Sequence, residues 1–164
     1  MSTVIHAPPA VVWRDLEDIA SHVEWMEEAV ALRFITTCRR GVGTTFECDT
    51  RVGPFALTDV MEVTEWRPRR RLGIRHVGHI TGHGHFSLRP LRGGRTRFTW
   101  KERLHFPWWL GGPIGAVVGG EVLRMIWRQN LRNLAARFEQ AAPTRPISRR
   151  GSGTTAGRRL RRRP

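Results

Sequence analysis

Tyrosine is absent from this 164-residue chain, lysine occurs only at Lys101, and there are two cysteines. Without tyrosine, any mechanism that needs a phenol is excluded. Two cysteines are too few for a disulfide framework or a cysteine-rich zinc module. The longest uncharged stretch, residues 106–120, is 15 residues long and contains two prolines and five glycines. It is too short and too interrupted to span a bilayer.

Residues 1–6 contain neither the basic nor the apolar region of a secretory signal peptide. We therefore expect a cytoplasmic protein whose cysteines, Cys38 and Cys48, are reduced structural thiols. Apolar residues make up 40% of the chain, including seven tryptophans and seven phenylalanines. This content is sufficient for the core of one domain, which we place at residues 1–142.

The charge is strongly positive and unevenly distributed. The chain has 28 basic and 14 acidic residues, a formal charge of +14, and residues 143–164 contain eight arginines and no acid. Subtracting that segment leaves 20 basic and 14 acidic residues, or +6, for residues 1–142. The excess of arginine over lysine can arise from selection for phosphate binding or from a GC-rich genome, and we favour the genome. We expect residues 143–164 to be a disordered, arginine-rich tail that binds polyanions weakly and non-specifically.

The hydrophobic pattern changes period twice along the chain. Residues 2–6 form a short β-like run, Pro8 and Pro9 open a short helix, and Ser21 can cap a second one. Alternating runs separated by turn signals then predict six strands, at residues 31–37, 43–52, 56–66, 71–78, 81–90 and 95–106. A long helix begins at residue 113 or 120 and continues to about residue 140.

The long helix carries one continuous apolar stripe, formed by Leu123, Trp127, Leu131, Leu134 and Phe138. A seven-stranded antiparallel sheet has one face to bury, and this helix is the partner available. We therefore predict an α+β fold in which a curved seven-stranded sheet wraps round the C-terminal helix, with two short helices after the first strand. Such a sheet tends to leave an apolar gap, where small ligands bind.

Four segments carry a resemblance to a known family. They are the opening VIHAPPAVVWRDLEDIASHVEWM, the strand segment ALTDVMEVTEWRPRRRLGIRH, the hairpin FSLRPLRGGRTRFTWKERLHFP and the helix RQNLRNLAARFE, which together span residues 2–140. Their order and pattern resemble the helix-grip, START-like (SRPBCC) superfamily, which includes polyketide cyclases/dehydrases and lipid-transfer proteins. The resemblance implies a cavity between sheet and helix that binds lipids, polyketides or other hydrophobic molecules, and many members are not enzymes.

Two carboxylates are candidates for the interior. Alternation in the last strand places Glu102 on the face of Phe98, Trp100, Leu104 and Phe106, so Glu102 is a carboxylate among aromatic residues. Burial raises the pKa of a carboxyl group and prepares it for acid–base catalysis or ligand anchoring. The alternative is a structural Glu102 that is paired with an arginine or lies near the rim. Asp59 shares the parity of Leu57 and Met61, but apolar Val60 makes its face ambiguous, and a solvated or arginine-paired Asp59 is the alternative.

Four histidines cluster at positions 76, 79, 83 and 85. Direct pairing of residues 76 and 83 would place His76, His83 and His85 on one face, whereas a slip of one residue places His76 with Gly84 and Phe86. The cluster has no HExxH motif and no neighbouring acid in sequence, so we expect no bound metal and no cofactor. His76 is the best candidate for a cavity histidine, and a satisfied core or rim histidine is the alternative.

Five aromatic residues are predicted to contact the ligand: Trp25, Phe98, Trp100, Trp108 and Trp127. The loop with Trp108 and Trp109 is either an apolar lid that contacts the membrane transiently or a segment packed under the helix or in a dimer interface. The sequence leaves the oligomeric state open.

The predicted function is the binding or transport of a hydrophobic small molecule or lipid in the cavity, without catalysis. One alternative is a polyketide cyclase, aromatase or dehydratase in which Glu102, His76 and Asp59 are catalytic. Another is a regulatory protein that binds a macromolecule.

Overall fold

The computed structural model describes residues 1–106 and 112–140, and the side chains of residues 1–106 and 120–140. The predicted tail and the Trp108–Trp109 loop lie outside these residues. The elements follow in the order β1 (Ser2–Ile5), α1 (Pro9–Leu16), η1 (Ile19–Glu24), β2 (Ala29–Phe34), β3 (Thr45–Val52), β4 (Phe55–Arg67), β5 (Arg71–Val77), β6 (Thr81–Leu91), β7 (Arg95–His105) and α2 (Gly112–Gln140).

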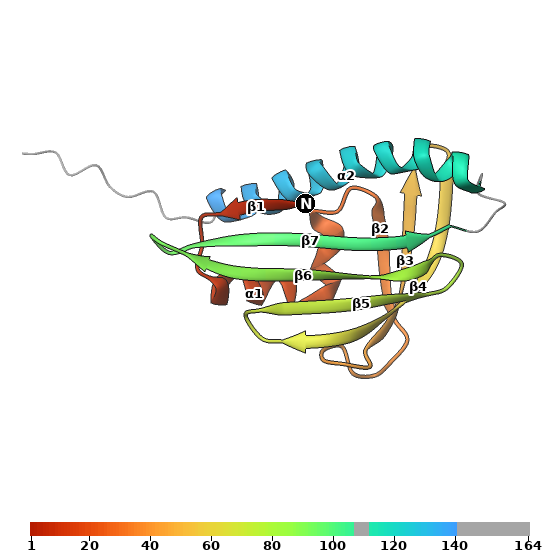
Figure 1. Ribbon diagram of the computed structural model, residues 1–164. Coiled ribbons are helices and arrows are strands. Elements are labelled where there is room, and N and C mark those ends of the chain that lie inside the picture. The colour runs from red at the N-terminus through yellow and green to blue at the C-terminus, as the bar shows by residue number, and fades with distance from the viewer. Residues whose placement is uncertain (107–111, 141–164) are drawn as a thin grey trace, which may run out of the picture.

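The seven strands form one antiparallel sheet in the order β1-β7-β6-β5-β4-β3-β2. The helix α2 runs along one side of the curved sheet, and α1 lies behind strands β6 and β7 in Figure 1. The predicted helix-grip architecture and its element order are therefore confirmed, with strand bounds that differ by a few residues. No helix in the described part of the chain combines the length and apolarity needed to cross a membrane.

Local sequence explains several elements. Pro8 and Pro9 begin α1, where proline costs no hydrogen bond, and Val12, Trp13 and Leu16 form its buried face. The β6–β7 hairpin turns through Gly93 and Gly94, whose φ angles of 74° and 66° favour glycine.

The second short helix differs from the expectation. It is the 3₁₀ helix η1, it begins after Asp18, and Trp25 follows it as the C-terminal cap. The Ser21 hydroxyl donates to the backbone oxygens of Asp15 and Asp18, at 3.2 and 2.8 Å. Ser21 therefore stabilises the turn between α1 and η1 instead of capping a helix.

The core lies between the inner face of the sheet and the layer formed by α1, η1 and α2. Leu131, Leu134 and Phe138 of α2 are buried, in agreement with the predicted stripe. The helix is also held by polar contacts to the segment after η1. The buried Asn130 side chain accepts a hydrogen bond from the Glu27 amide at 3.0 Å and donates one to Glu28 Oε2 at 2.7 Å.

Candidate functional site

Three strands that are distant in sequence bring Asp59, His76 and Glu102 together on the inner face of the sheet. Asp59 lies on β4, His76 on β5 and Glu102 on β7, and Met61 on the face of Asp59 pairs directly with His76. The exposed fractions of the three side chains are 3%, 6% and 6%, respectively. The structure thus unites the three predicted acid–base residues in one buried polar centre.

Asp59 points toward the inner face of the sheet, a direction that the sequence left open. The β3–β4 register pairs Asp59 with Cys48 and Met61 with Phe46, and both partners are buried. The alternative of a solvated Asp59 is therefore wrong. The β5–β6 register pairs His76 with Gly82 and Arg75 with His83, so His76 faces inward and His83 does not.

Glycines provide the space for this centre. β6 separates β5 from β7, and on the inner face it has Gly82 and Gly84 beside His76 and Glu102. A Cβ atom on Gly84 would lie 3.2 Å from both Cγ and Oε1 of Glu102. Because β6 has no side chain at this point, the imidazole reaches across a whole strand to the carboxylate. Gly78 has the same role for Asp59, since a Cβ there would clash with Asp59 Oδ1.

Both ring nitrogens of His76 contact a carboxylate. Nδ1 lies 2.8 Å from Asp59 Oδ2, and Nε2 lies 2.8 Å from Glu102 Oε1. The second oxygen of Glu102 accepts a hydrogen bond of 3.0 Å from Trp100 Nε1, and the second oxygen of Asp59 accepts one of 3.3 Å from the Ile80 amide. Each carboxylate oxygen therefore has a partner within the protein.

These contacts determine the protonation of His76. Burial lowers the pKa of the imidazole, but the hydrogen bonds to Asp59 and Glu102 outweigh burial and raise that pKa to about 9. At neutral pH the ring is an imidazolium, and both N–H groups donate.

Sequence reasoning missed two further groups near this centre. The carboxyl group of Glu28 follows η1, and its pKa is raised by burial and by the nearby charge of Glu102, although the hydrogen bond from Asn130 opposes the shift. Burial also raises the pKa of the Cys48 thiol, which lies beside Asp59 on β3. Glu28 sits in an irregular segment without periodicity, so no sequence pattern could have identified it.

The predicted ligand-contacting aromatic residues lie side by side and contact one another. Phe98 is completely buried, Trp25 is 1% exposed, and the ring centroids of Trp25 and Trp100 are 6.1 Å apart. Trp127 of α2 covers Trp100 with a centroid distance of 5.3 Å. Phe86 joins this group through Trp100, at 5.3 Å. Trp108, the fifth predicted residue, lies outside the described residues.

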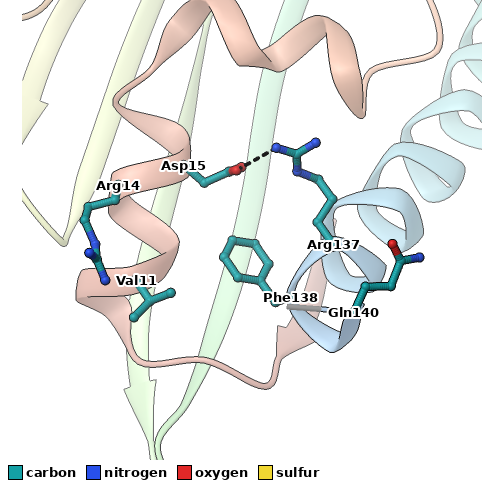
Figure 2. Close-up of a pocket in the computed structure, with 6 residues that line it drawn as sticks. All are labelled: Val11, Arg14, Asp15, Arg137, Phe138 and Gln140. Atoms are coloured by element: carbon teal, nitrogen blue, oxygen red, sulfur yellow. Dashed lines mark hydrogen bonds and ion pairs between the residues drawn. The ribbon is translucent and has the colours of Figure 1, made fainter. Parts of the chain in front are cut away.

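The sequence predicted that these rings line a cavity, but in the structure they pack against one another. Two cavities lined by described residues lie elsewhere. The larger cavity, of about 540 Å³, lies between α1 and the C-terminal end of α2. Its lining includes an ion pair, in which Nη2 of Arg137 lies 2.9 Å from Oδ1 of Asp15 (Figure 2). The second, of about 350 Å³, lies on strands β2 to β4 and is lined in part by Arg33 and Asp49. None of the predicted site residues within the described part of the chain lines either cavity.

The structure does not support a metal site in the part of the chain that it describes. Within residues 1–106 and 120–140, no group of three or more His, Cys, Asp or Glu side chains could hold an ion. His83 pairs with Arg75 and Arg103 across the strands, away from the buried centre. The face-sharing of His76 with His83 and His85 that one register allowed is therefore wrong.

Several solved structures share this architecture. The chain is similar in structure to Zhui aromatase/cyclase from Streptomyces sp. R1128, with 15% identity, a TM-score of 0.70 and coverage of 85% of this chain and 92% of that one. A START superfamily protein from Mycobacterium smegmatis is 15% identical, with a TM-score of 0.65 and coverage of 87% and 97%. The protein TTHA0849 from Thermus thermophilus is 20% identical, with a TM-score of 0.68 and coverage of 87% and 97%. These likenesses show the fold.

A comparison with models of sequence families identifies the family of this chain. The model of the family described as "Polyketide cyclase / dehydrase and lipid transport" matches residues 1–139, and the chain belongs to this family. Among curated proteins, none is similar enough in sequence to be matched.

Proposed function

We propose that the protein binds a hydrophobic small molecule or lipid between the sheet and α2, without catalysis, and that the Asp59–His76–Glu102 centre anchors the polar end of the ligand. Membership of a family of cyclases, dehydrases and lipid-transport proteins supports a hydrophobic ligand. The single observation that favours binding over catalysis is the position of His76 between two carboxylates, each 2.8 Å away.

A general acid or base works best when its pKa lies near the operating pH. His76 is protonated at neutral pH because its pKa is raised to about 9, so it cannot accept a proton from a substrate. It is also a weak proton donor, since leaving either carboxylate would cost a buried charge-assisted hydrogen bond. The centre is therefore suited to holding a fixed charge pattern.

That charge pattern selects the polar group of the ligand. Both imidazolium N–H groups are occupied by Asp59 and Glu102, so the hydrogen-bonding capacity that remains is the lone pairs of the carboxylate oxygens. A hydroxyl or ammonium group can donate to Glu102, and the half-buried Glu28 adds a second acceptor in the same region. A free carboxylate has no proton to donate to these oxygens, so it would bind less well. The apolar part would contribute about 25 cal/mol per Å² of buried surface.

The ligand would enter beside α2. Trp100 and Glu102 share a face of β7, and Trp127 covers Trp100. Figure 1 shows α2 running antiparallel to β7, so the C-terminal part of β7, which carries Glu102, follows the N-terminal half of the helix. Val122 and Met125 in that half are exposed, at 36% and 65%, which provides apolar surface near the proposed entrance.

Three probes of equal chain length test the proposal: 1-dodecanol, dodecylamine and dodecanoate. Binding is followed by tryptophan fluorescence, because Trp25, Trp100 and Trp127 surround the region. We expect the alcohol and the amine to bind more tightly than the carboxylate. Tighter binding of dodecanoate would contradict the role of the centre. Native mass spectrometry of protein purified from its own host, followed by solvent extraction, would identify the class of any natural ligand.

A matched pair of variants locates the anchor. Glu102→Gln should weaken dodecylamine by about tenfold to a hundredfold, the value of a charge-assisted hydrogen bond, and should change dodecanol less. Glu139→Gln removes the same charge from the exposed end of α2 and should leave both affinities unchanged. Equal effects of the two variants would exclude a direct role for Glu102.

A cyclase or dehydratase is the second candidate function. The structural similarity to an aromatase/cyclase favours it. Glu102 would then move protons during ring closure or loss of water from a polyketide-like substrate. Glu102→Gln separates the two functions: the turnover of an enzyme would collapse, whereas a carrier would keep most of its affinity for a neutral ligand.

A further inference from the structure

The outer face of strands β6 and β7 is strongly basic. Side chains alternate between the two faces of a strand, so the residues of β7 opposite Phe98 and Trp100 point outward. The surface that we call the basic face contains the exposed cations Arg89 on β6 and Arg97, Lys101 and Arg103 on β7, with His83 and His85 between them. Arg95, at the start of β7, is exposed on the same face. Glu102 is the only acidic residue of these two strands, and it points inward.

Two like charges are directly opposed across this face, because Arg89 pairs with Arg97. Such a pair destabilises a sheet, because the two side chains lie about 5 Å apart at Cβ. Lys101 pairs with His85, and Arg103 pairs with His83. Burial, Arg71 and Lys101 together lower the pKa of His85, as expected for a ring surrounded by cations. An anionic partner would relieve the repulsion among the arginines and lysine of this face.

Carboxylates of the protein do not neutralise these cations. On the neighbouring strands, Arg71 pairs with Glu65 at 2.8 Å and Arg75 with Glu62 at 2.6 Å. The cations of β6 and β7 differ from these two arginines. Within residues 1–106 and 120–140, no carboxylate forms an ion pair with Arg89, Arg97, Lys101 or Arg103. A composition rich in arginine accounts for many cations, but it does not account for the exclusion of acids from one face.

The acidic residues lie away from the basic face. Six of the 14 fall between residues 15 and 28, in α1, η1 and the segments that follow these two helices. Four more, Glu47, Asp49, Glu62 and Glu65, lie on β3 and β4 and pair with arginines there and on the neighbouring strands. The helices α1 and η1 cover the inner face, and Figure 1 shows α1 behind β6 and β7. The two sides of β6 and β7 therefore differ in charge, with the basic face outside and the acidic segment of residues 15–28 inside. An extended anionic plane would attract the first and repel the second, so it would orient the molecule.

We propose that the basic face docks on the surface of an anionic lipid bilayer. Binding of a single-stranded nucleic acid relies on large aromatic side chains for base stacking, and the outward positions of β6 and β7 contain no Phe, Tyr or Trp. β7 is paired with β1 on one edge and with β6 on the other along Thr96–Thr99, so these residues do not form a free two-stranded ribbon that could enter a groove of duplex DNA. A plane of anionic headgroups needs charge alone, which the basic face supplies.

Two charge-matched variants of the full-length protein test this docking. The face variant has Arg89→Gln, Arg97→Gln, Lys101→Gln and Arg103→Gln. The control variant has four substitutions on the helical side: Arg14→Gln, Arg124→Gln, Arg128→Gln and Arg132→Gln. Each lowers the formal charge of +14 by four, and each keeps the C-terminal arginines. Circular dichroism and thermal unfolding establish that both variants fold.

Binding is measured by flotation with vesicles of phosphatidylcholine, alone or mixed with phosphatidylserine, at about 0.1 M salt. Each cation near an anionic surface contributes about fivefold in affinity, so loss of the four cations should weaken binding of the face variant to mixed vesicles by up to about 600-fold. The control variant should stay close to wild type, and phosphatidylcholine alone should bind none of the three proteins.

Three results would overturn the proposal. Equal weakening of both variants would show that only net charge matters. Undiminished binding by the face variant would show that the tail or the Trp108–Trp109 loop, and not the basic face, contacts the vesicles. Duplex DNA that binds more tightly than mixed vesicles, and loses that binding in the face variant, would identify a nucleic acid as the partner. All three results are independent of whether the buried centre binds a ligand.

Discussion

The stability of the protein should fall as the pH rises from about 6.5 to about 9, because His76 loses its proton over that range. Burial lowers the pKa of this imidazole, and the hydrogen bonds to Asp59 and Glu102 raise it from 6.5 to about 9. A group whose pKa is raised on folding contributes its full stability below the unfolded pKa and loses it as the pH passes the folded pKa. This contribution amounts to about 3 kcal/mol, at about 1.4 kcal/mol for each pKa unit.

The measurement is urea-induced unfolding of wild type and His76→Gln between about pH 6 and about pH 10. The free energy of unfolding of wild type should decrease through this window. His76→Gln keeps a hydrogen-bonding amide but cannot titrate, so the difference between the two proteins should shrink by most of the 3 kcal/mol. His83→Gln, on the outer face, is the control and should follow wild type.

Other titrating groups do not mimic this effect. Burial lowers the pKa values of His22 and His85, so these rings reduce stability below pH 6.5 and not above it. Burial raises the pKa of Cys48 above its ordinary 9.0, so its contribution begins at higher pH. Glu28 is present in both proteins and cancels in the difference. Parallel curves for wild type and His76→Gln, or an NMR titration of the His76 ring with a pKa near 6.5, would refute the reasoning.

Three further substitutions test the packing around the centre. Gly84→Val places methyl groups against the Glu102 carboxylate, so the pKa of His76 should fall toward 6.5 in an NMR titration, and stability should drop by about 1–3 kcal/mol. Leu134→Ala removes a completely buried side chain of α2 and should cost about 2–5 kcal/mol in urea unfolding, and a loss below 1 kcal/mol would contradict its place in the core. Asn130→Ala leaves the Glu28 carboxylate without its donor and should cost about 1–3 kcal/mol, whereas an unchanged melting temperature would show that the bond contributes nothing.

Local sequence determined most of the architecture. The alternation of apolar residues predicted the strands, because a strand with one buried face must repeat every two residues. The stripe that includes Leu131, Leu134 and Phe138 predicted the long helix and the face that it buries, which the structure confirms. Both signals depend only on neighbours in sequence, so they can be read without knowing which strand lies beside which.

The polar centre depended on tertiary structure. The face of Asp59 was ambiguous because Val60 is also apolar, and only its pairing with buried Cys48 resolved it. The environment of His76 depended on strand register, since a shift of one residue turns every side chain to the other face.

The bridge from His76 to Glu102 crosses a strand through the space left by Gly84, and no periodicity reports such a contact. A glycine inside a strand does indicate a close approach of other groups, so the run from Gly82 to Phe86 contained part of this information. The partner that approaches is chosen by the order of strands in the sheet. The sequence by itself therefore determined the elements and their buried faces, whereas only the packed sheet decided that one histidine would be held between two carboxylates.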